Sequence, residues 1–147
     1  MIVEIDELDR RIVSALQRDS RISYNSLAKL CGASTPTVVD RVRRLEDLGV
    51  IQGYGVSINR HKLGWGITAL IRLSCGQDQY QKMNRLAQDM SEIVECYHVT
   101  GEDAFHLKVT AKDIAHLETL ISRFSALGRS ASTIVLSTVC EGKQTPV

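Results

Sequence analysis

The chain has 147 residues and a formal net charge of only +1; 44% of its residues are hydrophobic and 24% are charged. This composition is typical of a folded globular protein and excludes a fibrous or disordered chain. Because the net charge is close to zero, any role with nucleic acid depends on a local basic cluster. The run Arg41-Val42-Arg43-Arg44 is such a cluster.

Hydropathy and cysteine spacing further limit the class of protein to which the chain can belong. Residues 1–9 are acidic and lack the basic segment followed by an apolar run that is typical of secretory signals. No stretch approaches the ~20 apolar residues of a membrane span, so we expect a cytoplasmic protein. The four cysteines stand singly, as Cys31, Cys75, Cys96 and Cys140. Zinc sites usually contain close pairs of cysteines, so we expect no metal, and we expect no cofactor.

Three short helices are predicted at the start of the chain. Apolar residues recur at helical spacing over residues 5–16. Ser23 caps a second short helix, which ends at Gly32. After a tight turn, Ser34 or Thr35 caps a third. Two short helices joined by a turn that contains glycine form a helix-turn-helix, in which the second helix reads DNA.

The third helix carries the side chains predicted to contact DNA. Its apolar stripe is Val38, Val42 and Leu45, and the polar side chains project off that stripe. The predicted contacts are Ser34, Thr35, Thr37, Asp40, Arg41 and Arg44. Arginine pairs with guanine or holds phosphate, whereas Asp40 repels phosphate and is expected to read a base or to pair with Arg44. The alternative is a solvated charged face with no partner.

A composition change after the third helix predicts a second domain. Residues 50–58 contain β-branched side chains interrupted by Gly53 and Gly55, which predicts a small β-ribbon or wing. Residues 59–66 lack a period and are predicted to be a linker. The predicted domains are therefore a winged helix-turn-helix at 1–58 and a second domain at 67–147.

The second domain is predicted to have the order β-α-β-β-α-β. The strands are expected at residues 67–75, 93–100, 105–111 and 132–140. Helices capped by Asp78 and Asp113 lie between them. This order is the ferredoxin-like sandwich, so the fold class is α+β. Its helices leave one face of the sheet bare, where Leu70, Val99 or Val135 would lie, so we expect a homodimer.

The whole pattern from Ile5 to about Cys140 resembles the Lrp/AsnC (feast/famine) family of transcription regulators. The resemblance rests on Asp6, Asp9 and Ile12, on the runs 34–45 and 49–54, and on Leu63-Gly64, Cys96-Tyr97, Thr100-Gly101 and residues 133–137. It implies a winged helix-turn-helix joined to a ligand-sensing domain that pairs into dimers. It also implies that dimers assemble into octamers and bind amino acids between them.

The resemblance places an effector site at the turn after the second predicted strand, where it approaches the last strand. The predicted effector-binding residues are Thr100, Gly101, Glu102, Asp103, Thr133 and Ser137. A carboxylate holds the ammonium of an amino acid, and hydroxyls or backbone amides hold its carboxylate. Many family members carry Asp at the third position after the glycine, and this chain has Ala104 there. An ordinary hairpin turn is the alternative.

These observations predict a sequence-specific DNA-binding transcription regulator whose binding to duplex DNA is modulated by a small molecule, an amino acid. The alternative is an architectural protein that wraps DNA with little sequence preference and has no effector. An enzyme is not expected, because the sequence has no phosphate-binding glycine loop, no zinc motif and no nucleophile elbow.

Overall fold

The computed structural model of the chain describes residues 3–147 and contains two compact units. The first unit consists of the residues up to Ser57 together with Cys140–Val147. The second unit is Ile58–Val139. The last eight residues therefore group with the helices, which differs from the single domain over 67–147 that the sequence predicts.

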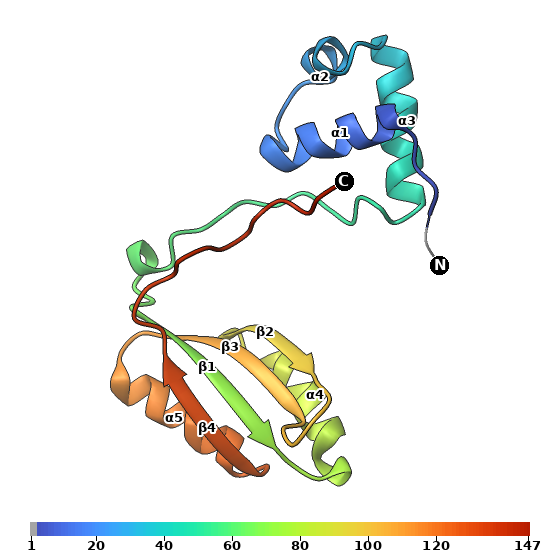
Figure 1. Cartoon of the computed structure of the whole chain (residues 1–147). Coiled ribbons are helices and arrows are strands. Elements are labelled where there is room, and N and C mark those ends of the chain that lie inside the picture. Colours follow the sequence, from blue (N-terminus) through green and yellow to red (C-terminus); the bar gives the residue numbers. More distant parts are fainter. Residues whose placement is uncertain (1–2) are drawn as a thin grey trace. The chain divides into compact units, whose positions relative to one another are not determined.

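The first unit is the predicted helix-turn-helix. Its helices are α1 (Glu7–Arg18), α2 (Tyr24–Cys31) and α3 (Thr35–Asp47), drawn from blue to cyan in Figure 1. All three contribute to one apolar core, whose fully buried residues are Ile12, Ala15, Leu27, Ala28, Cys31, Val38, Val42 and Leu45.

Local side-chain bonds fix where these helices begin. Asp6 caps α1 by accepting from the backbone N–H of Asp9 at 2.9 Å, and the carboxylate of Asp9 accepts in return from the N–H of Asp6 at 3.2 Å. This reciprocal capping box satisfies two donors that have no partner inside the helix. Ser34 caps α3, and Gly32 ends α2 with φ of 67°, a conformation that glycine adopts without strain. The turn between α2 and α3 is thereby fixed by sequence.

The predicted wing strand at residues 50–58 is wrong. Residues 51–59 form neither helix nor strand. A strand needs a neighbouring strand to satisfy its backbone groups, and none of residues 3–147 forms a strand that pairs with this segment. The segment is held instead at Tyr54, whose hydroxyl donates to Glu46 of α3 at 2.8 Å.

This contact predicts a pH dependence at the alkaline end. Partial burial, followed by the bond to Glu46, raises the pKa of Tyr54 from 10.0 to about 12. A raised pKa favours the protonated form in the folded state, so its contribution to stability is complete below pH 10 and is lost as the pH rises towards 12. The measurement is the difference in tyrosinate absorbance between the wild type and Tyr54→Phe, which isolates the signal of Tyr54. As the pH is raised, this difference should titrate near 12 in the folded protein and near 10 in urea. A difference that titrates near 10 in both states would contradict this.

The C-terminal tail, Cys140–Val147, is part of the first unit. The side-chain amide of Gln17 in α1 forms two bonds with the backbone of Thr145: its Nε2 donates to the carbonyl at 3.0 Å, and its Oε1 accepts from the N–H at 2.7 Å. Thr145 and Val147 line a groove of about 640 Å³ together with the end of α1 and the segment after α3. The tail thus supplies part of the lining of this groove.

The second unit is a four-stranded antiparallel sheet with two helices on one face (Figure 1). The strands are β1 (Ile67–Ser74), β2 (Ile93–His98), β3 (Phe105–Ala111) and β4 (Arg129–Ile134). Helix α4 (Tyr80–Asp89) follows β1, and α5 (Ile114–Ser125) follows β3. The strand order β2-β3-β1-β4 and the element order β-α-β-β-α-β are those of the predicted ferredoxin-like sandwich.

The core of this unit lies between the sheet and the helices. Alternate residues of β1 and β3 meet side chains of α4 and α5 there, and the buried set includes Ile71, Leu73, Met83, Phe105, Leu107, Val109, Leu120 and Phe124. On the opposite face Leu70 is 48% exposed and Tyr97 is 56% exposed, whereas Val99 and Val135 are half-buried. The sheet therefore has a face that the two helices leave uncovered.

Two details of the second unit differ from the prediction. The last strand is β4 rather than residues 132–140, because Arg129 already pairs with Ser74 of β1 and the pairing ends at Ile134. Asp78 does not cap α4, since it lies within a 3-10 turn, Gln77–Gln79, ahead of that helix.

Candidate nucleic-acid interface

Helix α3 has one buried side and one exposed side. Val38, Val42 and Leu45 are at most 1% exposed. Since an α-helix has 3.6 residues per turn, Asp40 and Arg43 lie on the opposite side, and both are exposed. This is the side that the second helix of a helix-turn-helix presents to the major groove.

The predicted hydroxyls at the start of α3 divide into two groups. Ser34 and Thr37 are exposed, with their hydroxyl oxygens 2.6 Å apart, and Ser34 also accepts from the backbone N–H of Thr37 at 3.3 Å. Thr35 is half-buried, and its hydroxyl donates to Asn25 of α2 at 3.0 Å. Ser34 and Thr37 are therefore open to a partner, whereas Thr35 joins the two helices of the motif.

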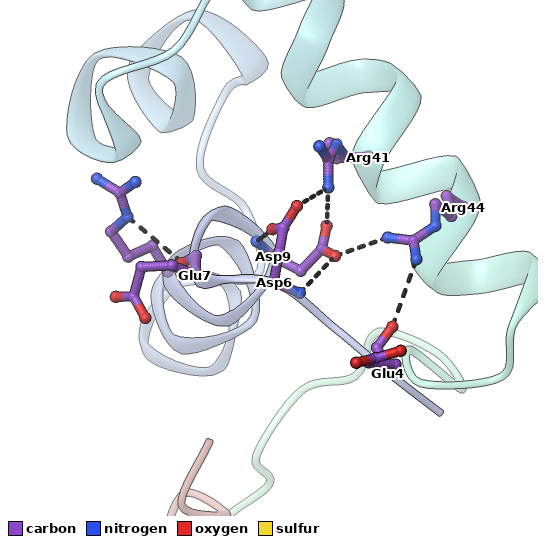
Figure 2. Close-up of polar contacts among 7 residues, drawn as sticks. Glu4, Asp6, Glu7, Asp9, Arg41 and Arg44 are labelled. Carbon is purple, nitrogen blue, oxygen red and sulfur yellow. Dashed lines mark hydrogen bonds and ion pairs between the residues drawn. The ribbon is translucent and has the colours of Figure 1, made fainter. Parts of the chain in front are cut away.

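Arg41 and Arg44 are held by acidic groups of α1, as Figure 2 shows. Nη1 of Arg41 bonds to a carboxylate oxygen of Asp6 and lies 3.2 Å from Oδ1 of Asp9. Nη1 of Arg44 lies 2.7 Å from Oδ2 of Asp9, and its Nη2 donates to the carbonyl of Glu4 at 3.4 Å. Two arginines of the predicted DNA site thus contact carboxylates of their own chain.

The electrostatics of this cluster favour its charged form. The backbone N–H of Asp9, together with the guanidinium of Arg41, holds the pKa of Asp6 below its ordinary value of 3.8. The bonds from Asp6 and Asp9 raise the pKa of Arg41 above its ordinary value. Asp6 and Arg41 are therefore both charged at neutral pH.

Arg43 is the exposed arginine that the predicted site leaves out. Within residues 3–147, neither Arg43 nor Asp40 forms an ion pair or a side-chain hydrogen bond. The predicted pairing of Asp40 with Arg44 is wrong, since Arg44 contacts Asp9 instead. The signal for Arg43 was present in the sequence, because position 43 lies opposite the stripe of Val38 and Leu45 on a helical wheel.

The predicted effector residues lie in two places. Gly101 has φ of 115°, and Asp103 lies 3.3 Å from Nε2 of His106 and 3.8 Å from Nη1 of Arg72. The turn is held to β1 by the hydroxyl of Ser74, which donates to the carbonyl of Glu102 at 2.6 Å. Asp103 therefore has two basic neighbours, Arg72 and His106, that the sequence analysis missed.

Thr133 and Ser137 lie away from this turn within one chain. Thr133 pairs with Leu70, whereas the turn adjoins Leu73, three residues and about 10 Å further along β1. Ser137 follows the end of β4, where the chain has already passed Thr68 at the far end of β1. The exposed side chains of Thr100 and Glu102 belong to the turn group. A site that uses all six residues therefore needs more than one chain.

Two kinds of feature are absent from the described residues, a cluster of metal ligands and a membrane-spanning helix. No group of three or more His, Cys, Asp or Glu side chains could hold a metal ion there. Burial raises the pKa of the Cys31 and Cys96 thiols, which disfavours the thiolate that a metal needs. No helix within residues 3–147 is long and apolar enough to cross a membrane.

Two stretches of the chain match known protein domains. Residues 5–46 match the AsnC-type helix-turn-helix domain, and residues 68–145 match the Lrp/AsnC ligand binding domain. The chain belongs to the Lrp/AsnC family. The family resemblance seen in the sequence is thereby confirmed.

Relatives in the Lrp/AsnC family match over most of the chain. The HTH-type transcriptional regulator LrpA of Mycobacterium tuberculosis is 34% identical over 143 residues, which is 95% of each chain. The leucine-responsive regulatory protein of Escherichia coli is 34% identical over 121 residues, 80% of this chain and 74% of that protein. The solved structure of Bacillus subtilis LrpC has a TM-score of 0.89 and 26% identity, covering 94% of this chain and 99% of that chain. This Lrp/AsnC protein is therefore a helix-turn-helix transcription regulator with a ligand-binding domain, not an enzyme.

Proposed function

We propose that this Lrp/AsnC protein recognises specific sequences of duplex DNA through α3 and that an amino acid bound to the sheet unit modulates the recognition. The observation that carries the first part is the exposed side of α3, where Arg43 and Asp40 have no partner within residues 3–147. Arginine forms two parallel bonds with guanine, and a base-contacting arginine contributes about 1–3 kcal/mol of discrimination. Ser34, Thr37 and Arg44 flank this side of α3.

The proposed assembly is a homodimer, or a multiple such as an octamer. Leu70 and Tyr97 are exposed on the uncovered sheet face, and Val56, 80% exposed, lies in the unpaired segment after α3. Their exposure supports the proposal, because burying apolar surface against a second copy of the chain is favourable in free energy. Two α3 helices related by a two-fold axis require half-sites separated by whole turns of the duplex.

The proposed effector is an amino acid, supported by the match to a ligand-binding domain and by the name of the leucine-responsive E. coli relative. Arg72 and His106 offer positive or donor groups for a carboxylate, while Glu102 or Asp103 supplies the acidic partner of an ammonium. Ala104 is buried and supplies no carboxylate. In this proposal Asp103 takes over that role, and Thr133 and Ser137 come from another copy.

The test is a selection of duplexes from a randomised pool by the full-length protein, followed by anisotropy titrations at fixed salt. We expect the selected duplex to bind at least about 10³-fold more tightly than a mixed-sequence duplex. At least one of the twenty amino acids, with leucine tried first, should shift that affinity by about 5–150-fold. Asp103→Asn should abolish the shift and leave DNA binding by the free protein intact.

Arg43→Ala provides the matched test of the interface, with Arg85→Ala in α4 as the control for lost charge. We expect Arg43→Ala to weaken the selected duplex about 5–150-fold, the equivalent of about 1–3 kcal/mol, and Arg85→Ala to leave it unchanged. Equal affinity for selected and mixed duplexes would indicate the architectural alternative. An affinity that no amino acid alters would remove the effector from the proposal.

A further inference from the structure

The carboxylate of Asp9 is a buried charged group in the helix-turn-helix unit. Its side chain is 0% exposed, beside Ile12 and the other apolar residues of the first unit. Removing a carboxylate from water costs several kcal/mol unless ionic and hydrogen-bonding partners replace the solvent. A buried ion pair is therefore weak evidence of a purely stabilising role.

Both oxygens of Asp9 are engaged. Oδ1 accepts from Arg41 at 3.2 Å, and Oδ2 accepts from Arg44 at 2.7 Å and from the backbone N–H of Asp6 at 3.2 Å. Asp6 adds a second carboxylate at Arg41. The four side chains carry two negative and two positive charges, so their net charge is zero.

The two guanidinium groups remain partly open to solvent. The side chains of Arg41 and Arg44 are 32% and 45% exposed. Each guanidinium has five N–H donors in a fixed plane, and the bonds to α1 use only part of them. Each arginine is thus fixed in direction on the α1 side of α3 with some donors unused, as Figure 2 shows.

We propose that Asp9 is a positioning residue for DNA binding: it holds Arg41 and Arg44 in fixed, charge-neutralised positions and leaves Arg43 as the arginine of α3 that meets DNA with its full charge. This inference rests on the proposed function. It separates the arginine cluster of the sequence into two restrained side chains and one unrestrained side chain. Restraint of Arg41 and Arg44 limits unspecific contacts with phosphate. A guanidinium that is already paired with a carboxylate neutralises fewer phosphates, so fewer counterions leave the DNA on binding.

The test is Asp9→Asn in the full-length protein, titrated with a mixed-sequence duplex at several salt concentrations. Asparagine keeps an oxygen for the N–H of Asp6 but loses the charge that holds Arg44 and one of the two carboxylates that hold Arg41. We expect the plot of log affinity against log salt to steepen by about 0.9 for each phosphate that a freed arginine reaches. Affinity for the mixed duplex at low salt should rise, and the ratio of selected to mixed affinity should fall at least tenfold. A residue with only a structural role would weaken both duplexes without steepening the slope.

Matched variants separate charge from position. Glu7→Gln removes one negative charge from the same turn of α1, and its side chain has no ion-pair partner within residues 3–147, so its slope should equal that of the wild type. Asp6→Asn, at an exposed cap where asparagine is also favoured, removes one of the two carboxylates at Arg41 and leaves the contact with Asp9, so it should give a smaller steepening even if Asp9→Asn fails to fold. Adding Arg41→Gln and Arg44→Gln to Asp9→Asn should return the slope to its wild-type value.

Two results would overturn the inference, and they differ from each other. An unchanged slope in folded Asp9→Asn and in Asp6→Asn means that the arginines are not released towards DNA, while the proposed function stands. A wild-type protein that binds neither duplex at low salt removes the proposed function, and the positioning role falls with it.

Discussion

We expect Ile12→Ala to unfold the helix-turn-helix unit under conditions where the sheet unit stays folded. Ile12 is completely buried at the centre of the first core. Replacing a buried isoleucine by alanine costs about 2–5 kcal/mol. A core of this size rarely supplies more than about 3–5 kcal/mol of net stability, so the substitution removes most of it. DNA binding should be lost with the fold of this unit.

Two spectroscopic probes distinguish the units in a urea titration. Trp65, the single tryptophan of the chain, belongs to the second unit, so its fluorescence reports on the sheet domain. Circular dichroism of helix reports on both units. In Ile12→Ala an early helical transition should precede an unchanged tryptophan transition, whereas Leu30→Ala, at a position 64% exposed, should alter neither. If both probes moved together, the two units would unfold as one body and the expectation would fail.

We expect Gly128→Ala to destabilise the sheet unit by about 1–3 kcal/mol or more, the cost of overfilling a packed site. A methyl group at position 128 would overlap the carbonyl oxygen of Ser74 and lie 2.8 Å from Cβ of Cys75. The obstructing oxygen belongs to the backbone of β1, at the residue that pairs with Arg129. Relief of the overlap therefore requires β4 to move away from β1.

Hydrogen exchange and tryptophan fluorescence measure this effect. The backbone amides at the Arg129 end of β4 should exchange faster, and the urea midpoint of the Trp65 signal should fall. Gly53→Ala is the matched control, because nothing lies within 4 Å of a methyl group there and a neutral surface change stays within about 0.5 kcal/mol. A wild-type midpoint in Gly128→Ala would show that the strand ends accommodate the methyl group.

Periodicity and capping residues determined the parts of the fold that the sequence predicts well. Val38, Val42 and Leu45 repeat at helical spacing, and all three are buried in α3. Ser34 and Gly32 mark the turn of the motif through their own local geometry. Such signals depend on neighbours in sequence, so they are readable without the tertiary structure.

The environment of the arginines could not be predicted in the same way. Asp9 and Arg44 are separated by 35 residues, and their contact depends on how α1 packs against α3. Sequence spacing identifies which residues share a helix face, but it gives no information on which partner meets that face. Arg41 and Arg44 were therefore predicted as DNA contacts without their carboxylate partners, and Arg43 was left out.

The ends of strands could not be predicted from the sequence for a related reason. β-branched residues recur as far as Val139, yet β4 stops at Ile134. The N–H of Val135 still donates to the carbonyl of Thr68 at 2.9 Å, and β1 itself begins one residue beyond, at Ile67. The segment over residues 51–59 likewise has the composition of a strand, but no strand in the described part of the chain pairs with it. Propensity describes what a segment tolerates, whereas a strand exists only where another backbone pairs with it.

The return of Cys140–Val147 to the first unit determines how the protein can be divided into pieces. A fragment that ends at Ser57 lacks the peptide that pairs with Gln17, so it contains only part of the first unit. A complete unit needs the tail grafted back through a short flexible connector. Conversely, a protease cut after Ser57 leaves two pieces that still share a docked peptide, the arrangement used in split-protein complementation.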